Sequence, residues 1–77
     1  MSGENNMITY RPLWETLRKK HITQYELITK YQMSRGMLDN LKHDRSITIN
    51  TLNDLCDMLE CDITDIIEYT RSENNTD

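Results

Sequence analysis

Residues 23–44, TQYELITKYQMSRGMLDNLKHD, decide the fold of this chain because they predict two short helices joined by a tight turn. Thr23 is a suitable N-cap, and Glu26 three positions later completes a capping box. Ser34 is a second N-cap candidate, because its hydroxyl can accept hydrogen bonds from the unpaired backbone N–H groups that begin a new helix. With so short a connection, we expect the two helices to cross at a steep angle.

The second of these helices is expected to have an apolar side and a polar side. At about 100° per residue, Leu38 and Leu41 face the interior. The opposite side carries small or polar residues, which are Gly36, Asp39, Asn40 and His43, with Arg35 beside them in the first turn. Such groups suit base edges in a DNA major groove, where arginine pairs with guanine, asparagine with adenine and aspartate with the cytosine amino group. This pattern points to a helix-turn-helix.

Gly36 contributes no side chain to the polar side, and a glycine weakens a helix. Two interpretations stay open. The glycine could let the backbone approach a ligand closely, or it could be a neutral replacement that has no role.

These residues resemble the Cro and lambda-repressor-like helix-turn-helix domains, often called XRE-like. TQYEL is similar to the start of that family's second helix and SRGMLDNLK to its third, the recognition helix. The later LNDLCDMLECDITDII is similar to the fourth and fifth helices. Over residues 10–69, the resemblance implies an all-α, compact five-helix DNA-binding domain. The family commonly has a glycine where Gln32 stands, so we expect Gln32 to adopt a left-handed or irregular conformation at some cost.

The resemblance and the residue chemistry together assign expected roles on DNA. The residues expected to read bases are Arg35, Gly36, Met37, Asp39 and Asn40, with Met37 near a thymine methyl group. The residues expected to contact phosphates are Thr23, Gln24, Ser34, Lys42, His43 and Arg45.

Charge is distributed unevenly along the chain. The whole sequence has 9 basic and 13 acidic residues, a net charge of −4, which argues against a sequence-independent nucleic-acid coat. Residues 18–45 hold seven basic and three acidic residues, whereas residues 46–70 hold six acidic and no basic residues. The positive segment therefore coincides with the predicted helix-turn-helix and would attract phosphate.

The flanking segments predict the rest of one small domain. Residues 7–10 are β-prone and would form an edge strand or an extended arm, and Pro12 suits the first turn of a helix ending near Lys20. A further helix follows a cap at Thr48 or Asn50, and Asp62 caps a last helix. The expected inward residues of these helices are Leu13, Trp14, Leu17, Ile49, Leu52, Leu55, Cys56, Leu59, Ile63, Ile66 and Ile67. Residues 7–70 would form the domain, with disordered segments at 1–6 and 71–77.

Several other kinds of site are not expected. Cys56 and Cys61 lack metal-ligand spacing and are expected to be small buried residues of a cytoplasmic protein. No nucleophile motif or phosphate loop is present, so the chain is not expected to be an enzyme or to bind a metal or small-molecule cofactor. No stretch is long and apolar enough to span a bilayer. The expected partner is double-stranded DNA, bound by a homodimer that would supplement the small core.

Two alternatives remain. The same fold could bind a protein partner through an apolar surface made by Tyr25, Met33, Met37 and Tyr69. The chain could also be a small structural subunit of a larger complex, which predicts that it folds poorly alone.

Overall fold

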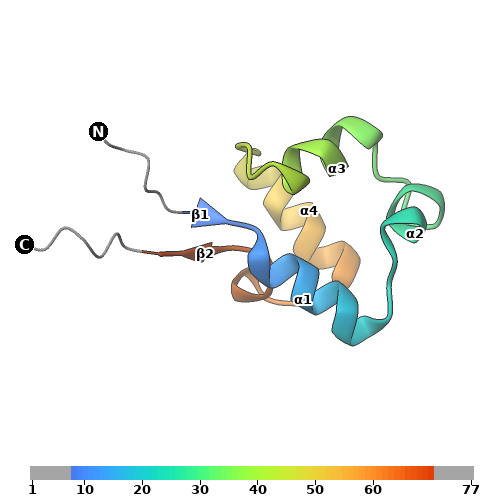
Figure 1. Ribbon diagram of the computed structural model, residues 1–77, viewed down its shortest axis with the longest axis horizontal. Helices are drawn as coiled ribbons and strands as arrows, with labels where there is room; N and C mark the ends of the chain where they lie inside the picture. Colours follow the sequence, from blue (N-terminus) through green and yellow to red (C-terminus); the bar gives the residue numbers. More distant parts are fainter. Residues whose placement is uncertain (1–7, 71–77) are drawn as a thin grey trace, which may run out of the picture.

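The computed structural model describes residues 8–70, so the expected disordered segments at 1–6 and 71–77 lie outside the described residues. In the described range, four α-helices are joined by short connections and one pair of strands closes the domain (Figure 1). The elements are β1 (Ile8–Thr9), α1 (Arg11–Lys20), α2 (Gln24–Thr29), α3 (Arg35–Lys42), α4 (Ile49–Leu59), the 3-10 helix η2 (Ile63–Asp65) and β2 (Glu68–Tyr69).

The predicted helix starts are confirmed. The Thr23 hydroxyl accepts from the Glu26 backbone N–H, and the Glu26 carboxylate accepts from the Thr23 N–H, both at 3.0 Å. Ser34 and Thr48 cap α3 and α4, and each hydroxyl accepts the backbone N–H three residues later at 3.0 Å. Because these bonds are local, they set the start of each helix without help from the rest of the fold.

Each α-helix is followed within a few residues by a left-handed residue that is not glycine. These residues are His21, Gln32, Asp44 and Glu60, with φ between 54° and 59°. The expectation for Gln32 is therefore confirmed. A left-handed residue redirects the chain sharply, and it does so here at a conformational cost that a glycine would avoid.

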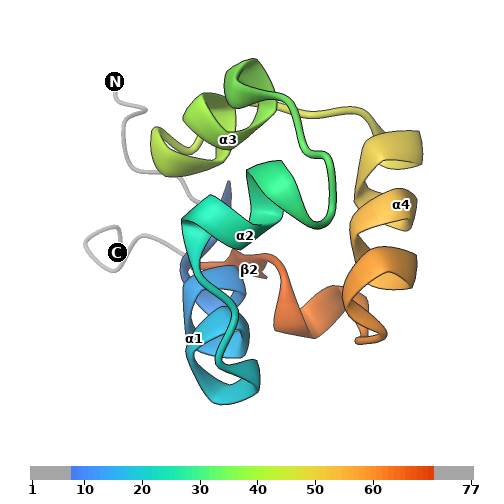
Figure 2. The same cartoon turned by 90° about the vertical axis from the view of Figure 1, so that its right-hand side faces the viewer.

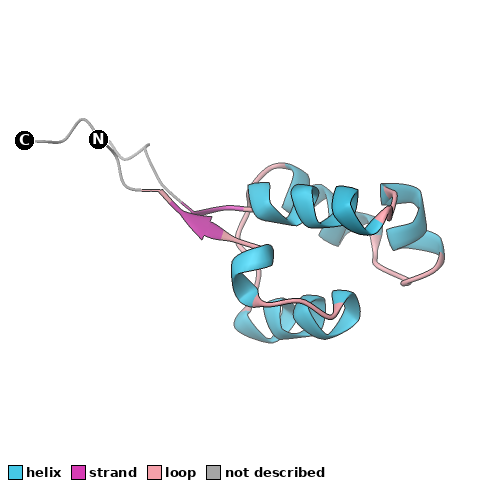
Figure 3. Ribbon diagram, turned by 90° about the horizontal axis from the view of Figure 1, so that it is seen from below, coloured by secondary structure: helices cyan, strands magenta, loops and turns pink. Residues whose placement is uncertain are grey.

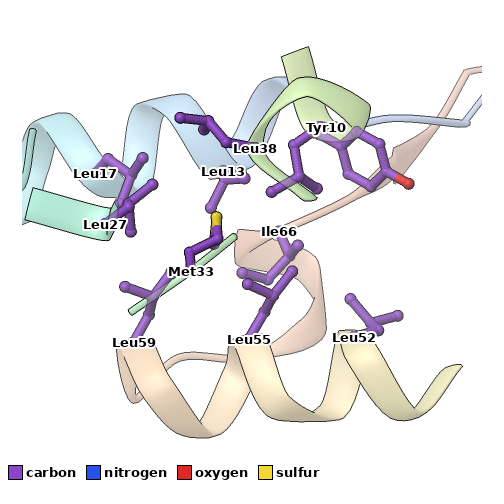
Figure 4. Packing of buried hydrophobic residues seen from close by; sticks show 11 residues of the cluster. Tyr10, Leu13, Leu17, Leu27, Met33, Leu38, Leu52, Leu55, Leu59 and Ile66 are labelled. Atoms are coloured by element: carbon purple, nitrogen blue, oxygen red, sulfur yellow. The ribbon is translucent and has the colours of Figure 1, made fainter. Parts of the chain in front are cut away.

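The core lies where the helices meet (Figure 4). Most residues expected to face inward are buried, and Leu13, Leu27 and Leu41 are completely buried. Trp14 and Cys56 are only partly buried and pack against this core. Thr16, which the pattern did not single out, is buried and its hydroxyl donates to the Asp65 carbonyl at 2.8 Å.

Three expectations about the C-terminal half are wrong. The expected fifth helix is a three-residue 3-10 helix, after which the chain becomes extended and β2 pairs antiparallel with β1, so the described fold is mostly helical, with four α-helices and one short strand pair. Ile63 is half exposed because the shortened helix does not turn it inward. Ile49 is 78% exposed, since it occupies the first helical position of α4, where the side chain projects to solvent.

The strand pair extends from the helical body (Figure 3). Ile8 pairs with Tyr69 and Thr9 with Glu68, so residues 8–9 of the segment 7–10, which was expected to be an arm or edge strand, form an edge strand, and Tyr10 already caps α1. Arg11 and Glu68 add an ion pair at 3.4 Å, and Thr9 donates to Glu68 at 3.3 Å. These contacts bring the two ends of the domain together on the side opposite α2 (Figure 1).

Candidate nucleic-acid interface

α3 lies at the outer edge of the helical body in two perpendicular views (Figures 1 and 2), and α2 lies below it in Figure 2. Leu38 and Leu41 anchor its inner side in the core. The outer side is uncovered: Arg35, Gly36 and Asp39 are exposed, and Asn40 and Met37 are partly exposed. Lys42, His43 and Arg45 are also exposed at the end of the helix and in the following loop. The polar side of α3 is therefore not packed inside the domain.

The start of α2 presents further polar groups. Thr23 and Gln24 are exposed there, as is Ser34 at the start of α3. The Thr23 and Ser34 oxygens already accept backbone N–H groups, but each hydroxyl keeps a proton that it can donate to an anion. Both helices therefore begin with available donors, as a phosphate contact requires.

The structure brings four predicted site residues into one cluster, defined by Asp39, Asn40, His43 and Arg45. Arg45 Nη1 lies 2.7 Å from Asp39 Oδ2 and 3.3 Å from Asn40 Oδ1. His43 Nδ1 lies 3.3 Å from Asp39 Oδ1. The hydrogen bond from Arg45 is the main cause that holds the pKa of Asp39 below its ordinary value of 3.8, and the charges of the neighbouring basic residues act in the same direction.

Tyr10 holds the loop after α3, a role that the sequence did not indicate. Its backbone N–H donates to Asp44 Oδ1 at 3.0 Å, and its hydroxyl donates to the Arg45 carbonyl at 2.6 Å. Burial, and secondarily the Asp44 charge, raise the pKa of Tyr10 above its ordinary value of 10.0. The phenol therefore stays protonated as a donor, and it ties the loop after α3 to the start of α1.

The apolar surface suggested for a protein partner is not assembled in this fold. Met33 is buried in the core, which corrects its expected place on that surface. Tyr25 and Tyr69 are 74% and 70% exposed, but they belong to α2 and β2, which lie at opposite sides of the domain in Figure 1. These residues therefore do not form one continuous patch.

The histidine, cysteine and acidic side chains of residues 8–70 are the candidate ligands for a metal ion. No group of three or more histidine, cysteine or acidic side chains in that range could hold a metal ion. Cys56 and Cys61 are unpaired and partly buried, and burial raises the pKa of both thiols. In the same range, no helix has the length and apolar character needed to cross a membrane.

Comparison with known proteins agrees with this geometry. The family model described as the Cro/C1-type HTH DNA-binding domain matches residues 12–72. The structure is similar to the crystal structure of the transcriptional regulator VanUg, with 25% sequence identity and a TM-score of 0.75, covering 94% of this chain and 97% of that one. No curated protein matches the chain. Because the family model spans most of the sequence, the chain belongs to the family of Cro/C1-type helix-turn-helix DNA-binding domains.

Proposed function

We propose that this protein is a sequence-specific transcriptional regulator that binds double-stranded DNA as a homodimer, with α3 in the major groove. The observation that carries the proposal is the outer side of α3, which is polar and uncovered while its inner leucines are buried. The role we assign is that of a repressor encoded by a bacterium, phage or mobile element, because a domain bound to DNA can exclude other proteins from the same site.

The proposed contacts divide into two groups. Bases would be read from the outer side of α3 by the side chains of Arg35 and Asn40, with Met37 near a thymine methyl group and Gly36 admitting the backbone. Phosphates would be contacted by groups at the helix ends, which fix the register on DNA without reading sequence. That second group is Thr23, Gln24, Ser34, Lys42 and His43.

Selection from a random pool of duplexes tests the proposal. Enrichment of a palindrome whose half-sites are about 10 base pairs apart would support both sequence reading and a dimer, because a dimer places its two recognition helices about one helical turn apart. Enrichment of one unpaired half-site would contradict the dimer. No enrichment would contradict sequence-specific binding.

Two substitutions separate the proposed roles. Arg35→Ala should cost about 1–3 kcal/mol on the selected sequence and relax the preference at one base pair, whereas Lys42→Ala should weaken binding to all sequences similarly. Lys19→Ala is the matched control for charge, because Lys19 is an exposed cation on α1 rather than on α3. If Arg35→Ala weakens binding to scrambled DNA equally, Arg35 does not read a base.

Salt dependence separates DNA binding from the protein-partner alternative. Affinity for duplex DNA should fall steeply with added salt, since bound phosphates release counterions. Salt-insensitive binding to a protein, without affinity for duplex DNA, would favour the alternative instead.

A further inference from the structure

The side chain of Arg45, from the loop that follows α3, contacts the outer side of that helix. Arg45 folds back, so that one nitrogen, Nη1, contacts Asp39 at 2.7 Å and Asn40 at 3.3 Å. Asp39 and Asn40 belong to the side of α3 that was expected to read bases. The Arg45 guanidinium therefore lies over this side of the helix and does not extend away from it.

The main chain of Arg45 is held as well as its side chain. Its backbone N–H donates to the Asn40 carbonyl at 2.8 Å, and its own carbonyl accepts from the buried Tyr10 hydroxyl at 2.6 Å. Because both ends of the residue are held, the guanidinium would lose less conformational freedom on binding a ligand than a free surface arginine does.

The donor inventory indicates which group faces the ligand. An arginine has five N–H donors in a planar fork. Of the side-chain nitrogens of Arg45, only Nη1 donates a hydrogen bond within the described residues 8–70. The Nε and Nη2 edge matches the paired acceptors O6 and N7 of guanine. The Asp39 carboxylate, by contrast, can only accept, and its Oδ2 already accepts from Arg45 at 2.7 Å. His43 Nδ1 lies 3.3 Å from Oδ1 but 2.9 Å from the Asp39 backbone carbonyl, so it does not occupy the second oxygen. A cytosine amino group would therefore compete with Arg45 for this carboxylate.

We propose that Arg45 reads a guanine and that Asp39 is a positioning residue that holds the Arg45 guanidinium in place for this contact. This inference rests on the proposed function. It replaces two expectations from the sequence, namely the cytosine contact of Asp39 and the phosphate contact of Arg45.

A double-mutant cycle on the selected DNA tests the proposal. Arg45→Ala should lower affinity on the order of tenfold and abolish the preference for one G·C pair. Asp39→Ala should lower affinity by a smaller factor and weaken the preference at that same pair, although it removes a negative charge near phosphates. The double variant should bind no more weakly than Arg45→Ala, because Asp39 acts only through Arg45. Both side chains are about half exposed, so the variants are expected to fold.

Two further variants test whether the planar guanidinium is needed and whether the loss of any exposed carboxylate has the same effect. Arg45→Lys should lose the G·C preference as Arg45→Ala does, since an ammonium lacks the planar fork. Asp54→Ala removes an exposed carboxylate from α4 and should leave every base preference unchanged.

Three results would overturn the proposal. Asp39→Ala could weaken binding as much in the Arg45→Ala background as it does in the wild type, which would mean that Asp39 contacts DNA itself. Asp39→Ala could strengthen binding to all sequences, which would reduce its role to repulsion. Arg45→Lys could bind like the wild type, which would make Arg45 a phosphate contact. Failure of the wild type to enrich any sequence would instead contradict the proposed function.

Discussion

Replacing Gly36 by alanine should change the stability of the free protein and its affinity for DNA in opposite directions. Gly36 is an exposed residue near the start of α3, its φ is not positive, and an added Cβ would meet no atom within 4 Å. The free protein therefore has room for the methyl group. Alanine in a helix is more stable than glycine by about 0.5–1 kcal/mol, and for a domain of this size that raises Tm by roughly 2–8 °C.

The same methyl group would project from the side of α3 that we place in the major groove. If the Gly36 backbone approaches the DNA closely, the added carbon must displace a neighbour, and overpacking of this kind costs about 1–3 kcal/mol. Affinity would then fall by roughly 5-fold to 150-fold. Thermal denaturation of the free protein and titration with the selected duplex at constant salt measure the two effects separately.

Asn53→Ala is the matched control, because Asn53 is an exposed helical residue on α4 and its replacement should leave DNA binding unchanged. Wild-type affinity in Gly36→Ala would refute the close approach and leave the neutral interpretation of the glycine. A lower Tm would show instead that the first turn of α3 has no room for the added methyl group.

Three other predictions concern titratable groups. Tyr10→Phe should lower the free energy of unfolding by about 0.5–1.5 kcal/mol through loss of the hydrogen bond to the Arg45 carbonyl. The raised pKa of Tyr10 means that its contribution is complete below pH 10.0 and is lost as pH rises through the folded pKa; denaturation at alkaline pH should show this loss in the wild type but not in the variant. In Arg45→Ala, carboxyl NMR should find that the pKa of Asp39 rises toward 3.8, and an unchanged value would contradict the pairing. Because burial raises the pKa of Cys56 and Cys61, alkylation of both thiols should be slow at neutral pH and accelerate with pH. Alkylation at the rate of a small free thiol would contradict the raised pKa.

Local signals in the sequence predicted the helix-turn-helix well. A capping box at Thr23 and an N-cap at Ser34 depend on groups within three residues, so residue types alone reveal them. The inner positions Leu38 and Leu41 follow from the helical period in the same way. The left-handed Gln32 was expected by comparison with the family, and the connection between α2 and α3 has that conformation.

Contacts between distant residues could not be predicted in this way. The expected last helix is only the 3-10 helix Ile63–Asp65, and the chain after it turns to β2, whose residues 68–69 find backbone partners about sixty positions earlier, in β1. A helical period also cannot show that Ile49 begins its helix on the solvent side.

The contacts among the polar residues of the candidate site could not be predicted from the sequence either. Asp39 and Arg45 were assigned separate roles because spacing along a helix does not reveal a loop that turns back over it. The Tyr10 contacts that hold this loop join positions more than thirty residues apart.

The pairing of β1 with β2 has a consequence for how the protein is made. A ribosome releases residues 8–9 long before it synthesises residues 68–69. β1 therefore stays unpaired while the helices between the two strands pack together. Closing so long a loop carries a substantial entropic cost, which neighbouring contacts must already offset. We therefore expect the strand pair to be the last element to form during synthesis.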